Sequence, residues 1–316
     1  MTVVSSSPLV SIVMSAWKPR PDWLHEAVDS VLAQRECRFE LLVIDDGSPE
    51  PVAELLSHID DPRMRVERVP HGGLSRARNA GAALARGDYL RFVDCDDFYP
   101  PYSTAHLLSL AGGSHDIVTY GATLVCDDHL RPVWKMVSRV EGDFTVPSLL
   151  GRFHVRPHAL LFPRRVIEQT GEFDPSYRVT EDWDYILRAS EHARTRGDSN
   201  VATYYRRHSS SMTADTAGGE EAARRIVERY FELHPELQGT RLERLAQARL
   251  QATSARVRAT HGQPREAVRR FLNALRLDPR AVGYEIAQIV QAAWGHVRYA
   301  QLARMFSAIT PARSRG

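Results

Sequence analysis

Val10-Ser-Ile-Val-Met14 and Leu41-Leu-Val-Ile44 are the two apolar runs that decide the fold of this chain. Each has the length of a buried strand and ends in turn-forming residues, which after the second run are Asp45-Asp-Gly-Ser48. Between them, apolar residues recur at helical spacing over positions 24–32, and Asp22 stands where an N-cap is expected. Strand, helix and strand predict a right-handed βαβ unit with ligands beyond the carboxyl ends of its strands.

The same alternation continues downstream and indicates an α/β sheet flanked by helices. Further strands are expected at Met64–Val69, Tyr89–Val93, Asp116–Val125 and Ala159–Pro163, and helices at Val52–Ile59, Ser75–Ala85 and Glu181–Glu191. A second acidic cluster, Asp94-Cys-Asp-Asp97, follows the strand at Tyr89–Val93 just as Asp45-Asp46 follows the earlier one. In a doubly wound sheet both clusters are expected to open into one cleft.

After Thr213 the pattern is almost purely helical. Pro264 opens one helix and Pro279 closes it, and its apolar residues share one face, namely Ala267, Val268, Phe271, Leu272 and Leu275. With the preceding helix this segment resembles a tetratricopeptide-type hairpin, although such repeats need neighbours to bury their faces.

Composition and charge exclude several classes of protein. The 316 residues are 43% hydrophobic and 25% charged, as in a folded globular chain, and the net charge of +2 argues against a nucleic-acid-binding protein. From Thr213 onward there are 17 Arg and 10 acidic residues, a net charge of +7, which suits a solvated helical surface or an acidic partner. Three scattered cysteines, the absence of a signal-peptide pattern and the absence of a long apolar run favour a cytoplasmic protein without a transmembrane segment.

Two segments carry residues suited to a phosphorylated ligand. The carboxylates of Asp94–Asp97 are hard oxygen ligands for Mg²⁺ or Mn²⁺, and a turn after the strand would splay them. His71-Gly-Gly-Leu-Ser75 places glycines and a Ser N-cap before a helix that carries Arg78, an arrangement that favours an anionic diphosphate. Each segment alone is also compatible with a solvated turn.

Five motifs in order resemble the family 2 glycosyltransferases, which have the GT-A fold. They are Val10-Ser-Ile-Val-Met-Ser15, Asp45-Asp-Gly-Ser48, Gly73-Leu-Ser-Arg-Ala-Arg-Asn-Ala-Gly81, Asp94-Cys-Asp-Asp97 and Glu181-Asp-Trp-Asp184. The resemblance covers about residues 9 to 213. It implies a Rossmann-like, mostly parallel sheet with a nucleotide-sugar-binding part at 9–100 and an acceptor-binding part at 101–213. A flexible N-terminus at 1–8 and a helical extension at 214–316 complete the expected organisation.

The resemblance also implies roles for individual residues. The nucleotide of the donor is expected to contact Ser15, Ala16, Trp17, Asp46, Arg78, Asp94 and Cys95. Asp96 would ligate the metal, and Asp182 of the Glu181-Asp182 pair would be the general base. The expected reaction is an inverting, single displacement from a nucleotide diphosphate sugar, a UDP-sugar above others, assisted by Mn²⁺ or Mg²⁺.

A later segment resembles the place where the family often has a histidine near the metal and diphosphate. Arg206 and Arg207 are expected to bind the diphosphate, and His208 is either a metal ligand or a structural residue. Ser15-Ala-Trp-Lys18 departs from the usual Pro-Thr-Tyr-Asn of the family, so the identity of the nucleotide stays open. Trp17 can still stack on a base.

Rival hypotheses make different predictions. A sugar-nucleotide pyrophosphorylase or a nicotinamide dehydrogenase would carry a glycine-rich loop directly after the first strand, and residues 15–21 contain no glycine. A non-catalytic binding platform would use the basic helical tail. The sequence does not identify the acceptor, although Trp134, His154, Arg156 and His158 are candidates to line its pocket. The helical tail is a candidate homodimer interface.

Overall fold

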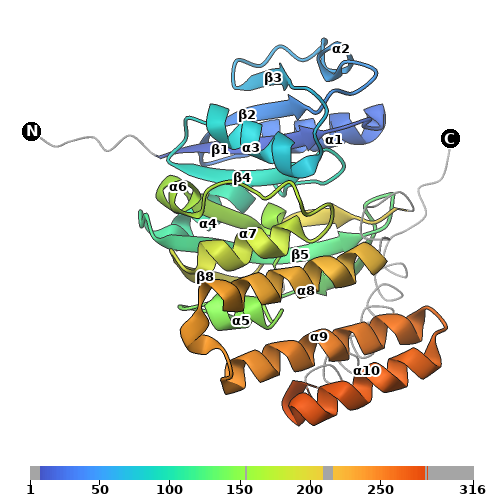
Figure 1. Ribbon diagram of the computed structural model, residues 1–316. Coiled ribbons are helices and arrows are strands. Elements are labelled where there is room, and N and C mark those ends of the chain that lie inside the picture. Colours follow the sequence, from blue (N-terminus) through green and yellow to red (C-terminus); the bar gives the residue numbers. More distant parts are fainter. Residues whose placement is uncertain (1–7, 154, 209–215, 282, 284–316) are drawn as a thin grey trace, which may run out of the picture. The chain divides into compact units, whose positions relative to one another are not determined.

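The computed structural model describes residues 8–153, 155–208, 216–281 and 283 (Figure 1). Expectations for the first seven residues, for His154, for residues 209–213 and for residues 284–316 lie outside this part of the chain. Two compact units are present, Met1–Arg131 with Lys135–Ala222, and Pro132–Trp134 with Ala223–Gly316. Each unit is described by itself.

A central sheet organises the first unit, as the apolar runs predict. Its strand order is β3-β2-β1-β4-β7-β5, and β8 also pairs with β5. The strands are β1 (Leu9–Ala16), β2 (Arg38–Asp45), β3 (Met64–Arg68), β4 (Tyr89–Asp94), β5 (Ile117–Cys126), β7 (Leu160–Pro163) and β8 (Arg194–Arg206). The first four strands are mutually parallel, β7 is antiparallel to both of its neighbours, and β8 is parallel to β5. The expected mostly parallel α/β architecture is confirmed.

Helices flank this sheet, and α3 packs on β1 and β2 (Figure 1). The helices and the 3-10 turn of the unit are α1 (Pro21–Leu32), α2 (Val52–Leu55), α3 (Leu74–Leu84), α4 (Ser103–Ala111), α5 (Thr145–Leu149), η1 (Pro157–Ala159), α6 (Arg164–Thr170) and α7 (Glu181–Ser190). The expected N-caps were wrong by two residues. Arg20 caps α1 and Gly73 caps α3, so that Asp22 and Ser75 lie inside the first turns. A carboxylate in a first turn still interacts favourably with the helix dipole.

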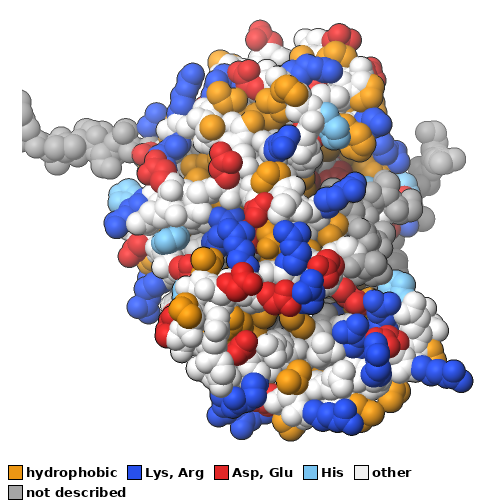
Figure 2. Space-filling model, in the orientation of Figure 1, with side chains coloured by type: hydrophobic (Ala, Val, Ile, Leu, Met, Phe, Trp, Pro, Cys, Tyr) orange, Lys and Arg blue, Asp and Glu red, His pale blue; other side chains and the backbone are white. Residues whose placement is uncertain are grey.

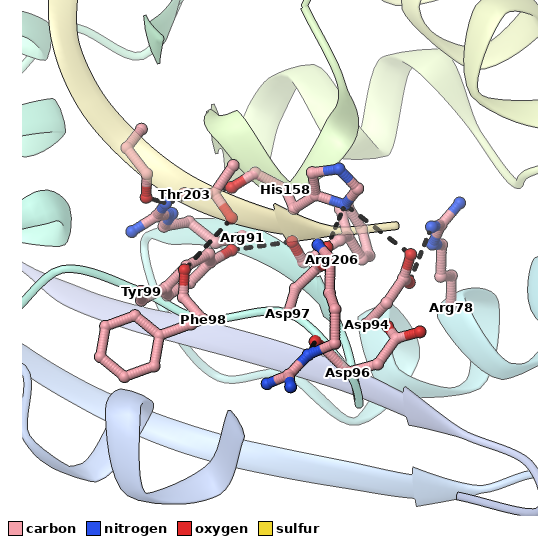
Figure 3. A network of polar contacts seen from close by, with 12 residues as sticks. Arg78, Arg91, Asp94, Asp96, Asp97, Phe98, Tyr99, His158, Thr203 and Arg206 are labelled. Carbon is pink, nitrogen blue, oxygen red and sulfur yellow. Dashed lines mark hydrogen bonds and ion pairs between the residues drawn. The ribbon is translucent and has the colours of Figure 1, made fainter. Parts of the chain in front are cut away.

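The two halves of the sheet meet along a narrow seam, which we define as the β4–β7–β5 junction. Only two residue pairs join β7 to β4, and two more join it to β5. Arg91 of β4 reinforces the seam, because its fully buried guanidinium donates to the carbonyls of His158 at 3.1 Å and Ala202 at 3.2 Å (Figure 3). Its Nη1 donates to the hydroxyls of Ser103 and Thr104. This cation is held by hydrogen bonds alone, with the Tyr99 ring 3.7 Å from it.

Gly81 marks the tightest contact between α3 and the sheet. A Cβ atom at this position would lie 2.2 Å from Val13 Cγ1 and 3.2 Å from Ile44 Cγ1. We expect Gly81→Ala to lower the free energy of unfolding by about 1–3 kcal/mol through overpacking, measured by urea denaturation. Gly219→Ala serves as the control, because a Cβ atom added at this helical position would meet no neighbouring side chain within 4 Å. This substitution should not lower the free energy of unfolding. Equal effects of the two substitutions would contradict the close contact.

The second unit contains a helical hairpin, α9 (Arg241–Thr260) and α10 (Pro264–Leu277). The helix expected to open at Pro264 is confirmed, and its apolar face is only partly buried. Ala274 is fully buried against Ala252, whereas Val268 and Leu272 are 58% and 46% exposed. The helices meet through small alanine side chains, which turns part of the larger apolar stripe outward.

Around the hairpin, α8 (Thr216–Leu233) and β6 (Pro132–Met136) span the boundaries of the units, and η3 (Pro235–Leu237) precedes α9. Many arginines of this region pair with neighbouring carboxylates, among them Arg224 with Glu228 and Arg270 with Glu266. Figure 2 likewise shows acidic and basic side chains interspersed on one face of the molecule. Solvent screens such exposed pairs, so they stabilise the fold only weakly. Among the described residues, no helix has the length and hydrophobicity needed to cross a membrane.

Candidate active site

Three parallel strands end side by side and form the floor of the candidate site. Ser15 of β1 lies opposite Ile44 of β2 and opposite Asp94 of β4. Asp46 follows β2, and its amide donates to the carbonyl of Ala16 at 2.9 Å. Both acidic motifs therefore border the same end of the sheet, where parallel sheets bind their ligands.

A buried arginine joins three of the motifs. Arg78 of α3, which is 3% exposed, donates Nη2 to Asp94 Oδ1 at 3.1 Å and Nη1 to Glu181 Oε1 at 2.9 Å (Figure 3). Burial lowers the pKa of Arg78, but Asp94, Glu181 and Asp182 together raise it above its ordinary value. Asp182 thus lies within electrostatic reach of the same guanidinium. The structure brings the predicted donor residues Arg78 and Asp94 together with the predicted catalytic pair.

Glu181 opens α7 in a buried position. Its side chain is largely desolvated, and this burial raises its pKa to about 7. The neighbouring Asp182 adds to the rise, whereas Arg78 only partly offsets it. Near neutral pH, Glu181 therefore exists in both the protonated and the ionised form.

This raised pKa makes stability depend on pH. Between the ordinary value of 4.5 and about 7 the folded chain binds more protons at Glu181 than the unfolded chain does, so the free energy of unfolding falls as the pH rises. We expect Glu181→Gln to reduce this fall, as measured by urea unfolding at about pH 5 and about pH 8. An unchanged pH dependence in the variant would contradict the assignment.

The acidic stretch after β4 turns on itself and sends its carboxylates in different directions. The Asp97 amide donates to the Asp94 carbonyl at 3.1 Å. Asp94 and Asp97 are directed toward His158 (Figure 3), while Asp96 Oδ2 lies 2.8 Å from His208 Nε2. Burial raises the pKa of Asp97 well above its ordinary value, and Asp96 and Asp94 add to the effect. The splaying expected from the turn is present.

Arg206 holds this turn in place. Its amide donates to Asp97 Oδ1 at 3.0 Å and its Nε to the Asp96 carbonyl at 2.9 Å. Its Nη1 and Nη2 donate to the carbonyl of Asp128 at 2.7 Å and to Glu26 Oε2 at 2.5 Å. The side chain is 2% exposed. A diphosphate would therefore have to displace Asp128 or Glu26 to reach the Arg206 guanidinium, which the sequence placed among the diphosphate ligands.

The two residues after Arg206 lie nearer the surface. Arg207 is exposed, and its amide donates to the Cys126 carbonyl at 2.9 Å. The ring of His208 packs against Trp23 with centroids 4.8 Å apart. The structure thus places His208, but not the Arg206 guanidinium, beside the Asp96 carboxylate with an accessible side.

The end of β2 forms a second, separate part of the site. Asp46, which is 3% exposed, accepts hydrogen bonds from the amides of Gly72 at 2.7 Å and Gly73 at 2.9 Å, and its Oδ2 lies 2.9 Å from His71 Nδ1. The His71 ring stacks on Trp17 with centroids 4.8 Å apart. Trp17 is 47% exposed and offers an aromatic surface to solvent. Sequence reasoning did not single out His71, although it opens the glycine segment.

The remaining predicted donor residues line the edges of this part. Ser15 is buried, and its Oγ has no hydrogen-bond partner among the described residues. Burial raises the pKa of the half-buried Cys95 well above its ordinary value, which keeps the thiol protonated. Lys18 Nζ lies 4.4 Å from the centre of the Trp17 ring.

His158 is the functional candidate that sequence reasoning placed elsewhere, with the acceptor residues. It is 3% exposed, and its ring stacks on Tyr205 with centroids 5.5 Å apart. Burial lowers the pKa of His158 to about 3, so the imidazole is neutral. Arg156 lies over the same Tyr205 ring, 4.4 Å from its centre. Only the strand pairing that brings η1 beside β4 reveals the position of His158.

Comparison with known proteins places the chain among relatives of one family. The family model described as glycosyl transferase family 2 matches residues 11–171, just over half of the chain. An uncharacterized glycosyltransferase of Rickettsia typhi is 26% identical over 66% of this chain and 66% of its own length. An uncharacterized protein of Sinorhizobium fredii is 27% identical over 72% of this chain, which spans only 26% of that longer protein.

Solved structures agree at the level of the fold. A crystal structure of residues 1–349 of S. aureus TarS in complex with UDP-GlcNAc matches with a TM-score of 0.56 and 14% identity, covering 83% of this chain and 89% of that chain. The GT-A fold expected from the motifs is therefore confirmed. By its family match over more than half of its length, this chain belongs to glycosyl transferase family 2.

Proposed function

We propose that this chain transfers a sugar from a UDP-sugar to an acceptor nucleophile with inversion, with Asp182 as the general base and a divalent cation at Asp96 and His208. One observation carries the proposal. Arg78 holds Asp94 and Glu181 together, so the motif assigned to the donor and the motif assigned to the acceptor border one site. The UDP-GlcNAc in the TarS complex supports a uridine nucleotide.

The residues at Asp96 fit a cation of the expected kind. Asp96 Oδ2 and His208 Nε2 lie 2.8 Å apart, and their side chains are 28% and 14% exposed. A carboxylate paired with an imidazole suits Mn²⁺, and the carboxylate also suits Mg²⁺. When bound, such a cation supplies positive charge to the leaving diphosphate.

The chain's own groups supply orientation and proton transfer. Asp182 Oδ1 accepts a hydrogen bond from the Trp183 amide at 2.8 Å, which orients Oδ2 to take the acceptor proton. As the bond from the acceptor to the anomeric carbon forms, the bond from that carbon to the diphosphate oxygen breaks. Trp17 provides a stacking surface for the base, and Asp46 keeps the Gly72-Gly73 loop beside it.

The cation assignment predicts a specific loss of metal response. We expect Asp96→Ala to abolish the stimulation of sugar transfer or donor hydrolysis by Mn²⁺, because the ligand is removed. Activity is measured across a Mn²⁺ titration. Asp128→Ala is the matched control, since it removes a nearby carboxylate but keeps the carbonyl that binds Arg206. A wild-type metal response in Asp96→Ala would reassign the ligand.

A donor screen tests the function itself. The protein is incubated with a panel of nucleotide sugars and Mn²⁺, and slow donor hydrolysis is followed by mass spectrometry. A glycosyltransferase of this kind releases free sugar and nucleoside diphosphate. A pyrophosphorylase would instead require added pyrophosphate and would convert the nucleotide sugar into sugar 1-phosphate and a nucleoside triphosphate. A non-catalytic platform would yield no product. Either of these last results would overturn the proposal.

A further inference from the structure

At the acidic turn that contains Asp96, three atoms of the kinds that bind metal ions converge from separate elements. They are Asp94 Oδ2 at the end of β4, Asp97 Oδ2 in the following turn and His158 Nδ1 in η1 (Figure 3). His158 Nδ1 lies 3.3 Å from Asp97 Oδ2 and 3.7 Å from Asp94 Oδ2. One ligand atom from each of the three residues lies within 4.8 Å of the others.

Hydrogen bonds within the described part of the chain leave two of these three atoms unsatisfied. Among the described residues, neither ring nitrogen of His158 nor Asp97 Oδ2 has a hydrogen-bond partner. His158 is 3% exposed and Asp97 is 1% exposed, so these atoms are not hydrogen-bonded to bulk water at the surface. A buried polar group without a partner is costly, which makes two such atoms side by side unusual.

The spacing suits a shared cation better than a shared proton. Nitrogen and oxygen ligands at about 2.0–2.2 Å from an ion lie roughly 3–4 Å from one another. The separations of 3.3 and 3.7 Å from His158 Nδ1 fall in that range. A hydrogen bond between an imidazole and a carboxylate would be shorter, at about 2.7–3.2 Å.

We propose that Asp94, Asp97 and His158 form a second, buried site for a first-row transition cation such as Mn²⁺, occupied without nucleotide. Two carboxylates with an imidazole form a donor set that favours such ions over Mg²⁺ or Ca²⁺, because imidazole suits transition metals. The only cation bonded to Asp94 among the described residues, Arg78, is shared with Glu181, and Arg156 acts on Asp94 and Asp97 only through its charge. Asp94, with a side chain 26% exposed, is the most accessible of the three ligands.

This site differs from the position at Asp96 and His208 in place and in role. The buried ion would cancel the repulsion between Asp94 and Asp97 and fix the acidic turn to η1. The turn would then present Asp96 outward. The inference goes beyond the proposed function, because it requires a cation in the free protein, before any donor binds.

Electron paramagnetic resonance of Mn²⁺ with the full chain and no nucleotide tests the inference. We expect one bound Mn²⁺ per chain, with pulsed spectra showing a coupled histidine nitrogen. His158→Gln should weaken this binding at least about tenfold. His208→Gln is the matched control and should retain both the binding and the nitrogen coupling. Because the control keeps His158 in its packed position, it tests the site even if His158→Gln fails to fold.

Two results would overturn the inference. The first is no binding of Mn²⁺ by the wild-type protein without nucleotide, and the second is loss of the nitrogen coupling in His208→Gln. The donor screen remains a separate readout. If the protein hydrolyses a donor but binds no Mn²⁺ in the absence of nucleotide, the buried site is wrong and the proposed function stands. If it binds Mn²⁺ in the absence of nucleotide but hydrolyses no donor, the proposed function is wrong and the buried site stands.

Discussion

Asp182→Asn is expected to lower the rate of sugar transfer by about 10²- to 10⁴-fold, the contribution typical of a positioned general base. The amide cannot take the acceptor proton, yet it keeps the size of the carboxylate. Its oxygen can still accept the Trp183 amide, so the start of α7 should stay in place. The rate is measured with saturating donor and Mn²⁺, and the affinity for UDP by calorimetry.

The affinity for the donor nucleotide separates a catalytic role from a structural one. UDP should bind the Asp182→Asn variant nearly as well as the wild type, because Asp182 faces the acceptor in our proposal. Glu191→Gln, at the other end of α7, is the control and should retain full activity. Normal turnover in Asp182→Asn would take the general-base role away from this residue.

Arg78→Leu is expected to destabilise the protein by about 3–5 kcal/mol, because it leaves two largely buried carboxylates without their common partner. The free energy of unfolding is measured in urea near pH 8, where Glu181 is mostly ionised. Near pH 5 the loss should be smaller, since protonation removes the charge of Glu181.

A neighbouring substitution controls for the loss of any arginine from the same helix. Arg76 lies on the exposed side of α3, and Arg76→Leu should change the free energy of unfolding by no more than about 0.5 kcal/mol. If Arg78→Leu were equally mild, the bridge between Asp94 and Glu181 would not hold the site together.

Periodicity predicted the N-terminal half of the sheet well because its strands are continuous apolar runs. The strand expected at Tyr89–Val93 appears as Tyr89–Asp94, and the run at Leu41–Ile44 lies within β2. By contrast, β8 was missed. Its first half is polar, and its pairing with β5 is irregular around Tyr120 and Ala122, so no alternation marks it in the sequence.

The site was only partly predictable for a related reason. Motif order placed Arg78, Asp94 and Glu181 in one site, but only the fold shows that the Arg78 guanidinium bonds to Glu181, 103 positions away. The environments of Arg206 and His158 likewise depend on tertiary contacts that no spacing encodes. Local sequence shows which groups are available, and packing decides which of them face one another.

The β4–β7–β5 junction connects the stability of the sheet with the position of the site residues. With two paired residues on each side, its backbone ladder is short, and the Arg91 guanidinium bridges elements on either side of it. His158 and the acidic turn lie next to this short ladder. Any loosening there would scatter the reactive groups while most helices and strands stayed intact, so the enzyme would become inactive well before it melted.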